Sequence, residues 1–202
     1  QRQMCIRDRR MDRVLEIMKD AAFSPIKDPV ISMGGLIGGE ARKLCEFHDL
    51  GKSLCGNVLG KGITYAMATL ETNASMGLIV ASPTAGSAGI VPGMMLALQE
   101  VYGFSDKKIR QALFNAGAIG YLAMRNATVA GAVGGCQAEV GIASAMAASA
   151  AVELLGGTPL QCTYAASTVL MNMLGLVCDP VGGLVESVSY THLRAHETEL
   201  HL

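Results

Sequence analysis

Two of the six cysteines lie in glycine-rich segments that suit a metal-binding thiol. Cys136 lies in the segment GGCQAEVG and Cys178 in LVCDPVGG. Glycine-rich backbone lets amide groups approach a sulfur atom and donate hydrogen bonds to it, and such bonds tune iron–sulfur clusters. The chain contains no CxxC pair, so cysteine spacing by itself is a weak signal. A shared metal site therefore requires a fold that brings these two residues together.

The other four cysteines carry less information. Cys5 lies in a polar segment at the start of the chain, while Cys45, Cys55 and Cys162 have apolar or mixed neighbours. A buried, unreactive thiol is the default expectation for these three. No apolar segment typical of a secretion signal follows the first arginines. We therefore expect reduced thiols and a cytoplasmic location.

A second segment that could take part in chemistry is PTAGSAG, residues 83–89. It offers the hydroxyls of Thr84 and Ser87, and it is expected to expose the backbone amides of Gly86, Ala88 and Gly89. Consecutive amides and hydroxyls in a turn can cradle a small carboxylate. The same composition also suits a tight turn between two helices, so both interpretations stay open.

A helical hairpin is expected to position the two cysteines. Residues 138–155 form a strong helix candidate, and Gly156 and Gly157 are typical of a helix C-cap. Thr158 can cap the next helix with Pro159 at its first position, and that helix runs to about Met173. A connection this short makes the two helices antiparallel neighbours. Cys136 and Cys178 then lie at the same end of the hairpin, close enough to share a metal.

The rest of the chain also favours helices, so we expect an all-α fold rich in small residues with glycine-rich loops around the site. Hydrophobic periodicity and cap residues predict helices over residues 10–22, 40–47, 63–76, 94–102 and 106–124, the last with Ser105 as N-cap. Loops are expected at 24–39, 81–93 and 126–137.

Composition excludes several classes of protein. The 202 residues include 16 basic and 17 acidic side chains and are 50% hydrophobic. This balance argues against a nucleic-acid-binding protein, which needs clustered Lys and Arg, and against intrinsic disorder. The uncharged stretch from Thr72 to Gln99 is broken by Pro and Gly residues. We therefore expect no membrane-spanning segment.

The two ends of the chain differ in composition from the rest. Residues 1–9 and 187–202 are polar and irregular, and the second segment holds His192, His196 and His201. His192 and His196 are four residues apart, a spacing that would suit a metal-binding site on a helix. The preferred interpretation is that both ends are foreign, adapter-like sequence flanking a domain over residues 10–186 that is incomplete at both ends.

Several motifs in one order carry a resemblance to a known family. The segments are ASPTAGSAGIVPG, LFNAGAIGYLAMRNATVAGAVGGCQAEVGIASAMAA, ELLGGTP and NMLGLVCDPVGGLVE. They resemble the alpha chain of bacterial iron–sulfur L-serine dehydratases from about Met11 to Glu186. The resemblance implies an all-helical catalytic domain around a [4Fe-4S] cluster, without pyridoxal phosphate.

The resemblance also implies site residues. Cys136 and Cys178 match the first two cluster-ligand positions, and the third position is 189, where Ser189 stands. This fragment is therefore expected to be inactive. Lys52, Ser53 and Asn126 match family motifs near the substrate, and Glu139 is expected either near the cluster or capping its helix. No residue is identified as the general base.

The implied reaction converts L-serine to pyruvate and ammonia, with an open cluster iron acting as a Lewis acid. The implied partner is a separate beta chain that forms a heterodimer with this one. Two alternatives stay open at this point: a related cluster-dependent L-cysteine desulfidase, and, from another class, a fragment of a membrane permease.

Overall fold

The computed structural model describes residues 2–173, 180–181 and 184–185, and it is dominated by helices. The described elements are α1 (Arg2–Lys27), α2 (Glu40–Asp49), α3 (Gly56–Ala74), α4 (Ile90–Tyr102), α5 (Asp106–Asn126), α6 (Gly131–Leu154), α7 (Pro159–Met173), β1 (Pro180–Val181) and β2 (Leu184–Val185). The two short strands pair antiparallel, with Pro180 opposite Val185. The expected all-α class is confirmed. Among the described residues, no helix is long and apolar enough to cross a membrane.

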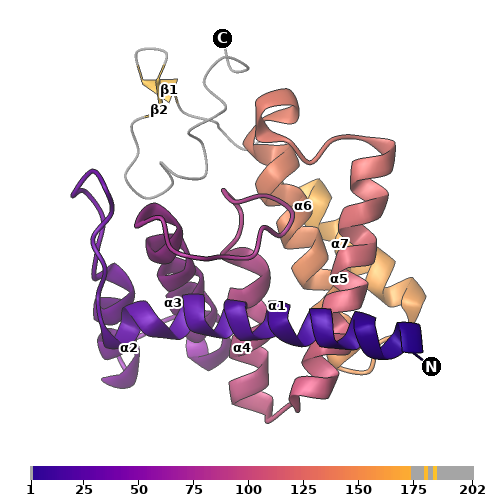
Figure 1. Cartoon of the computed structure of the whole chain (residues 1–202), viewed down its shortest axis with the longest axis horizontal. Helices are drawn as coiled ribbons and strands as arrows, with labels where there is room; N and C mark the ends of the chain where they lie inside the picture. The colour runs from indigo at the N-terminus through magenta and orange to yellow at the C-terminus, as the bar shows by residue number, and fades with distance from the viewer. Residues whose placement is uncertain (1, 174–179, 182–183, 186–202) are drawn as a thin grey trace.

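The helices form a bundle with α1 lying across one face (Figure 1). Helices α3 and α4 approach closely because glycines stand at their contact. A Cβ atom on Gly93 would lie 2.7 Å from the carbonyl oxygen of Gly62, and one on Gly89 would lie 2.6 Å from that of Ala66. Real Cβ atoms do not come that close to backbone, so only glycine permits this helix spacing.

The core lies where α1, α4, α5 and α6 meet, and aliphatic side chains and alanines fill it. Its most deeply buried large side chains include Val91, Met95, Leu96 and Ile109. Side chains of α3 and α4 are also linked, because Glu100 accepts hydrogen bonds from Tyr65 and from the Lys61 ammonium. These contacts fix the relative positions of the helices that carry the candidate site.

The turn between α6 and α7 agrees with the sequence prediction in detail. Gly156 has φ +86°, and the amide of Gly157 donates to the carbonyl of Val152 at 2.8 Å, as in a Schellman C-cap. Thr158 and Gln161 form a reciprocal capping box at the start of α7. The predicted hairpin of two antiparallel helices is therefore confirmed.

Other helix boundaries differ from the prediction. Helix α1 extends well beyond residues 10–22 at both ends, α3 begins seven residues earlier than expected, and α4 begins at Ile90 rather than Met94. The extensions of α3 and α4 and the C-terminal extension of α1 carry glycine or proline, whose weak helix propensity argued against helix there. Ser105 lies at the N-cap of α5 with extended backbone, but its hydroxyl makes no capping hydrogen bond.

The expectation of buried thiols is correct for one of three cysteines. Cys162 is buried, Cys45 is half-buried and Cys55 is exposed. Burial and the nearby Asp49 carboxylate raise the pKa of the Cys45 thiol. Cys55 is exposed because it lies in the connection between α2 and α3, outside the helix packing.

Candidate functional site

The candidate site lies at one end of the bundle, where the segment 80–89 meets the start of α6. Figure 1 shows the end of α3, the connection into α4, the end of α5 and the start of α6 gathered at this end. The tail of α7 reaches it as well. We call this the loop end. It brings together segments that lie more than fifty residues apart in the sequence.

A buried carboxylate connects the loop to α6. Glu139 is only 3% exposed, and its Oε1 accepts a hydrogen bond from the Thr84 hydroxyl. Oγ of Ser87 lies 3.1 Å from Oγ1 of Thr84. Glu139 therefore fixes the orientation of the Thr84 hydroxyl, and Thr84 in turn positions Ser87.

The backbone of this loop is anchored rather than open. The Asn73 side-chain amide donates to the carbonyl of Ala85 at 3.0 Å, and the amide of Ala88 donates to the same carbonyl at 3.3 Å. Gly86, Ala88 and Gly89 are buried, which corrects the expectation of exposed amides. They are buried because the loop packs between α3 and α6. Pro83, Thr84 and Ala85 keep exposed surface, so a ligand can reach the loop from their side.

Cys136 lies one helical turn before Glu139, directly after a break in α6. Gly135 has φ 76° and ψ 178°, a conformation open only to glycine. Cys136 is half-buried and begins the regular helical run that continues to Leu154. The N-terminal end of a helix favours negative charge, which suits a metal-binding thiolate. Helix α6 begins at Gly131, inside the stretch 126–137 that the sequence predicts to be a loop. The break at Gly135 also lies in that stretch.

The end of α7 lies beside the start of α6. A Cβ atom on Gly141 would lie 3.5 Å from Cβ of Met173 and 3.8 Å from a methyl of Leu170. The chain therefore leaves α7 at the loop end, as the sequence argument requires. Cys178 and Ser189, the other positions implied as cluster ligands, lie outside the described residues. Within the described ranges, no group of three His, Cys, Asp or Glu side chains could hold a metal ion.

Two of the residues implied by resemblance do not join this cluster. Lys52 and Ser53 precede α3 and line a separate cavity of about 420 Å³ with His48. Asn73, which contacts the loop, is near the other end of the 19-residue helix α3, and a helix of that length spans roughly 28 Å. Asn126 is exposed, and its side-chain amide donates to the carbonyl of Leu122 within α5. Their role in substrate binding stays a prediction.

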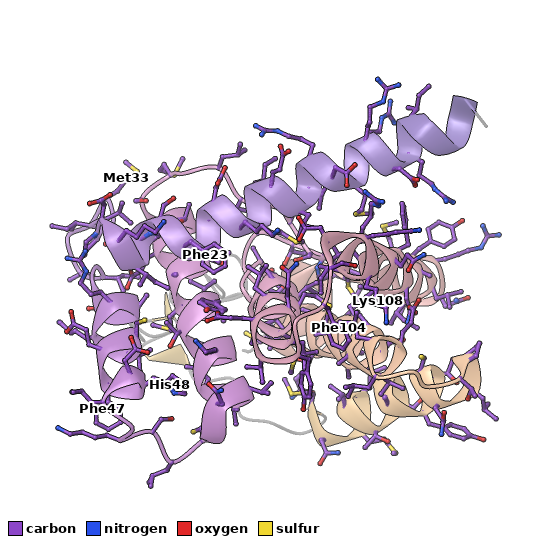
Figure 2. All side chains as sticks on the ribbon, turned by 90° about the horizontal axis from the view of Figure 1, so that it is seen from below. Phe23, Met33, Phe47, His48, Phe104 and Lys108 are labelled. Carbon is purple, nitrogen blue, oxygen red and sulfur yellow. The ribbon has the colours of Figure 1, made fainter. Side chains whose placement is uncertain are left out.

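Side-chain sticks show the arrangement of this second region (Figure 2), where Phe47 and His48 lie together on α2. Nε2 of His48 lies 3.0 Å from Oδ1 of Asn57, and its Nδ1 is buried without a hydrogen-bond partner. We call this region, residues 47–60, the α2–α3 turn. Exposed Leu54 and half-exposed Phe47 flank its cavity.

The loop end also holds a carboxyl pair that sequence reasoning missed. Glu71 is 2% exposed and accepts a hydrogen bond from the amide of Ala41 at 2.8 Å. Burial, and then the neighbouring Glu40 carboxylate, raise the pKa of Glu71. Burial alone would raise the pKa of Glu40. The backbone amides of Glu40 itself and of Gly38 donate hydrogen bonds to its carboxylate, and the pKa is lowered as a result. The pair joins the start of α2 to α3.

The contact between Thr84 and Glu139 was also missed, although the sequence held a signal for it. Glu139 is one of three charges between Gln111 and Cys178, and a carboxylate inside such an apolar stretch needs a polar partner. Fold and site together define an all-helical domain that gathers a cysteine, two hydroxyls and a buried carboxylate at one end.

Comparison with known proteins gives the family of this domain. The serine dehydratase alpha chain model matches residues 3–188. The chain therefore belongs to the serine dehydratase alpha chain family, and the resemblance found in its motifs is confirmed.

Individual relatives agree with this assignment. The chain is 51% identical over 176 residues to the probable L-serine dehydratase alpha chain of Bacillus subtilis, which covers 87% of this chain and 58% of that protein. It is 46% identical over 178 residues to the L-serine dehydratase alpha chain of Peptoniphilus asaccharolyticus, covering 88% and 61%. It is 42% identical over 123 residues to L-serine dehydratase TdcG of Escherichia coli, and this match covers 60% of this chain and 27% of that protein. The chain thus spans about three fifths of the alpha chains it matches.

Proposed function

We propose that this chain is the site-bearing part of an iron–sulfur L-serine dehydratase, which converts L-serine to pyruvate and ammonia. The observation that carries the proposal is the hydrogen-bonded connection from Ser87 through Thr84 to Glu139, one turn after Cys136. It supports the proposal because Thr84, which keeps exposed surface, is bonded to a residue one helical turn from the candidate metal-binding thiol. The names of the relatives supply the substrate.

The residues present fit a cluster at this position. Cys136 is half-buried and stands at the start of a regular helix, and the chain leaves α7 toward the same end. Cys136 and Cys178 would hold the cluster, and the third ligand is missing from this chain because Ser189 stands at its position. When bound, the cluster supplies a Lewis-acidic iron that makes the β-hydroxyl of serine a better leaving group.

The chain's own residues bind and orient the substrate. Because Thr84 donates its proton to Glu139, a lone pair on its Oγ1 is oriented to accept a hydrogen bond from the substrate ammonium. Loss of the α-proton and the β-hydroxyl releases one water and leaves an enamine. The enamine tautomerises to an imine, and a second water hydrolyses the imine to pyruvate and ammonia. Fixed hydroxyls contribute by positioning, since reacting groups held in place need no further ordering.

A separate beta chain is the proposed partner, because the relatives are named as alpha chains. The proposed setting is the cytoplasm, where cysteines stay reduced. This setting suits Cys45, Cys55 and Cys162, which form no disulfide. An iron–sulfur cluster needs such thiols as its ligands.

The test uses a chimera, because this chain spans only part of its relatives. Residues 11–186 replace the matching part of the Peptoniphilus alpha chain, which is then paired with the beta chain from the same organism and reconstituted anaerobically with iron and sulfide. We expect pyruvate and ammonia from L-serine. A chimera that forms a cluster and releases sulfide from L-cysteine, but makes no pyruvate from L-serine, would contradict the proposal in favour of a desulfidase.

A further inference from the structure

A second cavity lies behind the loop, away from Glu139. It has a volume of about 290 Å³, is lined by α1, α4, α5, α6 and residues 80–83, and is open to solvent on one side. Four methionines contribute to its lining: Met11, Met18, Met124 and Met146. Methionine is flexible and polarisable, so a lining rich in it adapts to ligands of irregular shape.

Two glycines of α5 keep this cavity open. Gly117 and Gly120 both line it. A Cβ atom on Gly117 would meet no atom within 4 Å, while one on Gly120 would come within 2.9 Å of the Met146 sulfur. Glycine inside a helix is destabilising relative to alanine. Gly117 is exposed, so it lies at the open side of the cavity, where a larger side chain would block the entrance.

One polar group in the lining lacks a partner. Ser82 lines the cavity, is 6% exposed, and has a buried Oγ without a hydrogen-bond partner. A buried hydroxyl without a partner is costly, and native structures rarely leave one unsatisfied. Among the described residues around the cavity, no side chain carries a charge. The lining therefore suits an apolar molecule with one hydrogen-bonding group, and it does not suit zwitterionic serine.

We propose that this cavity binds a small neutral molecule with an apolar body and one hydroxyl or carbonyl group that hydrogen-bonds to Ser82. An apolar cavity of about 150 Å³ holds benzene, so the present volume admits a body of about ten non-hydrogen atoms. This site is separate from the proposed serine site, and neither proposal depends on the other.

The ligand would bear directly on the candidate site. Ser82 and Pro83 immediately precede Thr84, and the amide of Ser82 donates to the carbonyl of Thr84 at 3.3 Å. A molecule held against Ser82 thus contacts the segment that carries the Thr84 hydroxyl. Binding in the cavity would restrict the motion of that segment from behind.

The first test follows the methionine methyl groups of the full 202-residue chain by NMR. The probe is 2-phenylethanol, which has nine non-hydrogen atoms and one hydroxyl. We expect saturable shifts of the Met11, Met18, Met124 and Met146 methyl signals. Met33 and Met171 are 80% and 64% exposed and lie outside the lining, so their signals serve as controls. Shifts of the control signals alone, or no saturable shift at all, would overturn the proposal.

Variants then separate the two features of the site. Gly117→Leu should abolish probe binding, whereas Gly34→Leu, at another glycine whose Cβ meets no atom within 4 Å, should leave it unchanged. Ser82→Ala should weaken 2-phenylethanol about fivefold, the effect of one hydrogen bond, while n-propylbenzene keeps its affinity. Circular dichroism checks that each variant folds. Binding that survives Gly117→Leu, or equal effects of Ser82→Ala on both probes, would refute the assignment.

Discussion

The loop end and the α2–α3 turn both hold residues that could do chemistry, but they are built differently. At the loop end, Thr84 and Glu139 come from segments 55 residues apart and meet in a buried hydrogen bond. At the α2–α3 turn, His48, Lys52, Ser53 and Cys55 are neighbours in the sequence and line a cavity with exposed rims. Tertiary packing therefore fixes side-chain orientation at the first region, while local sequence alone clusters residues at the second. Oriented groups are what catalysis requires.

The largest effect that would distinguish the two regions is expected from the thiols. In the reconstituted chimera, Cys136→Ser should abolish the cluster absorbance and lower the rate with L-serine by on the order of 10³-fold, because the Lewis acid is worth several kcal/mol. Cys55→Ser, at the α2–α3 turn, is the matched control and should leave iron content and rate unchanged. Equal losses in both variants would remove the distinction between the regions.

Loss of the hydrogen bond between the loop and α6 should lower the stability of the protein by a measurable amount. Thr84→Val removes the hydrogen bond to the buried Glu139 carboxylate, and we expect the free energy of unfolding to fall by about 2 kcal/mol. Urea denaturation of the 202-residue chain measures this change. Thr168→Val, on the exposed face of α7, should stay within about 0.5 kcal/mol of the parent. A Thr84→Val variant as stable as the parent would show that the loop is held without this bond.

The close packing of the loop against α3 can be tested with glycine variants. Gly89→Ala places a Cβ atom 2.6 Å from the carbonyl oxygen of Ala66, so overpacking should cost about 1–3 kcal/mol. Gly117→Ala adds the same methyl where a Cβ meets no atom, and helix propensity predicts a gain of about 0.5–1 kcal/mol. Thermal unfolding of both variants gives the comparison. Similar effects of one sign would contradict the packing argument.

The smallest effects concern pH, and the two parts of the molecule should respond in opposite directions. A raised pKa, as at Glu71, gives stability that is present below about pH 4.5 and lost as the pH rises through the folded-state value. Glu71→Gln should therefore become more stable relative to the parent as the pH rises above 4.5. Hydrogen–deuterium exchange or urea titration at pH 4 and 7 measures this trend.

Glu100, on the side of the α2–α3 turn, has a pKa that the Lys61 ammonium and the Tyr65 hydroxyl lower against the effect of burial. Its contribution is present above pH 4.5 and lost as the pH falls through the folded-state value. Glu100→Gln should thus cost less than about 1 kcal/mol at pH 7, since the pair is partly exposed, and almost nothing at pH 3. Parallel pH trends for the Glu71 and Glu100 variants would contradict the assigned directions.

Features that depend on near neighbours along the chain could be predicted from the amino-acid sequence. The turn from α6 to α7 follows from Gly156, Thr158 and Pro159, because helix caps are made by groups within a few residues of each other. The all-α class and the family follow from patterns and motifs in the same way. Cys136 was identified as a candidate ligand from its glycine-rich setting.

Contacts between groups that are distant in the sequence could not be predicted in this way, because they depend on helix packing. The contact of Glu139 with Thr84, the burial of Gly86, Ala88 and Gly89, and the separation of Lys52 from the loop all depend on which helix faces pack together. Burial and partner choice are properties of the packed bundle, and a linear pattern does not encode them directly. Residues 131–134 of α6 are also helical despite their glycines, which local propensity does not predict.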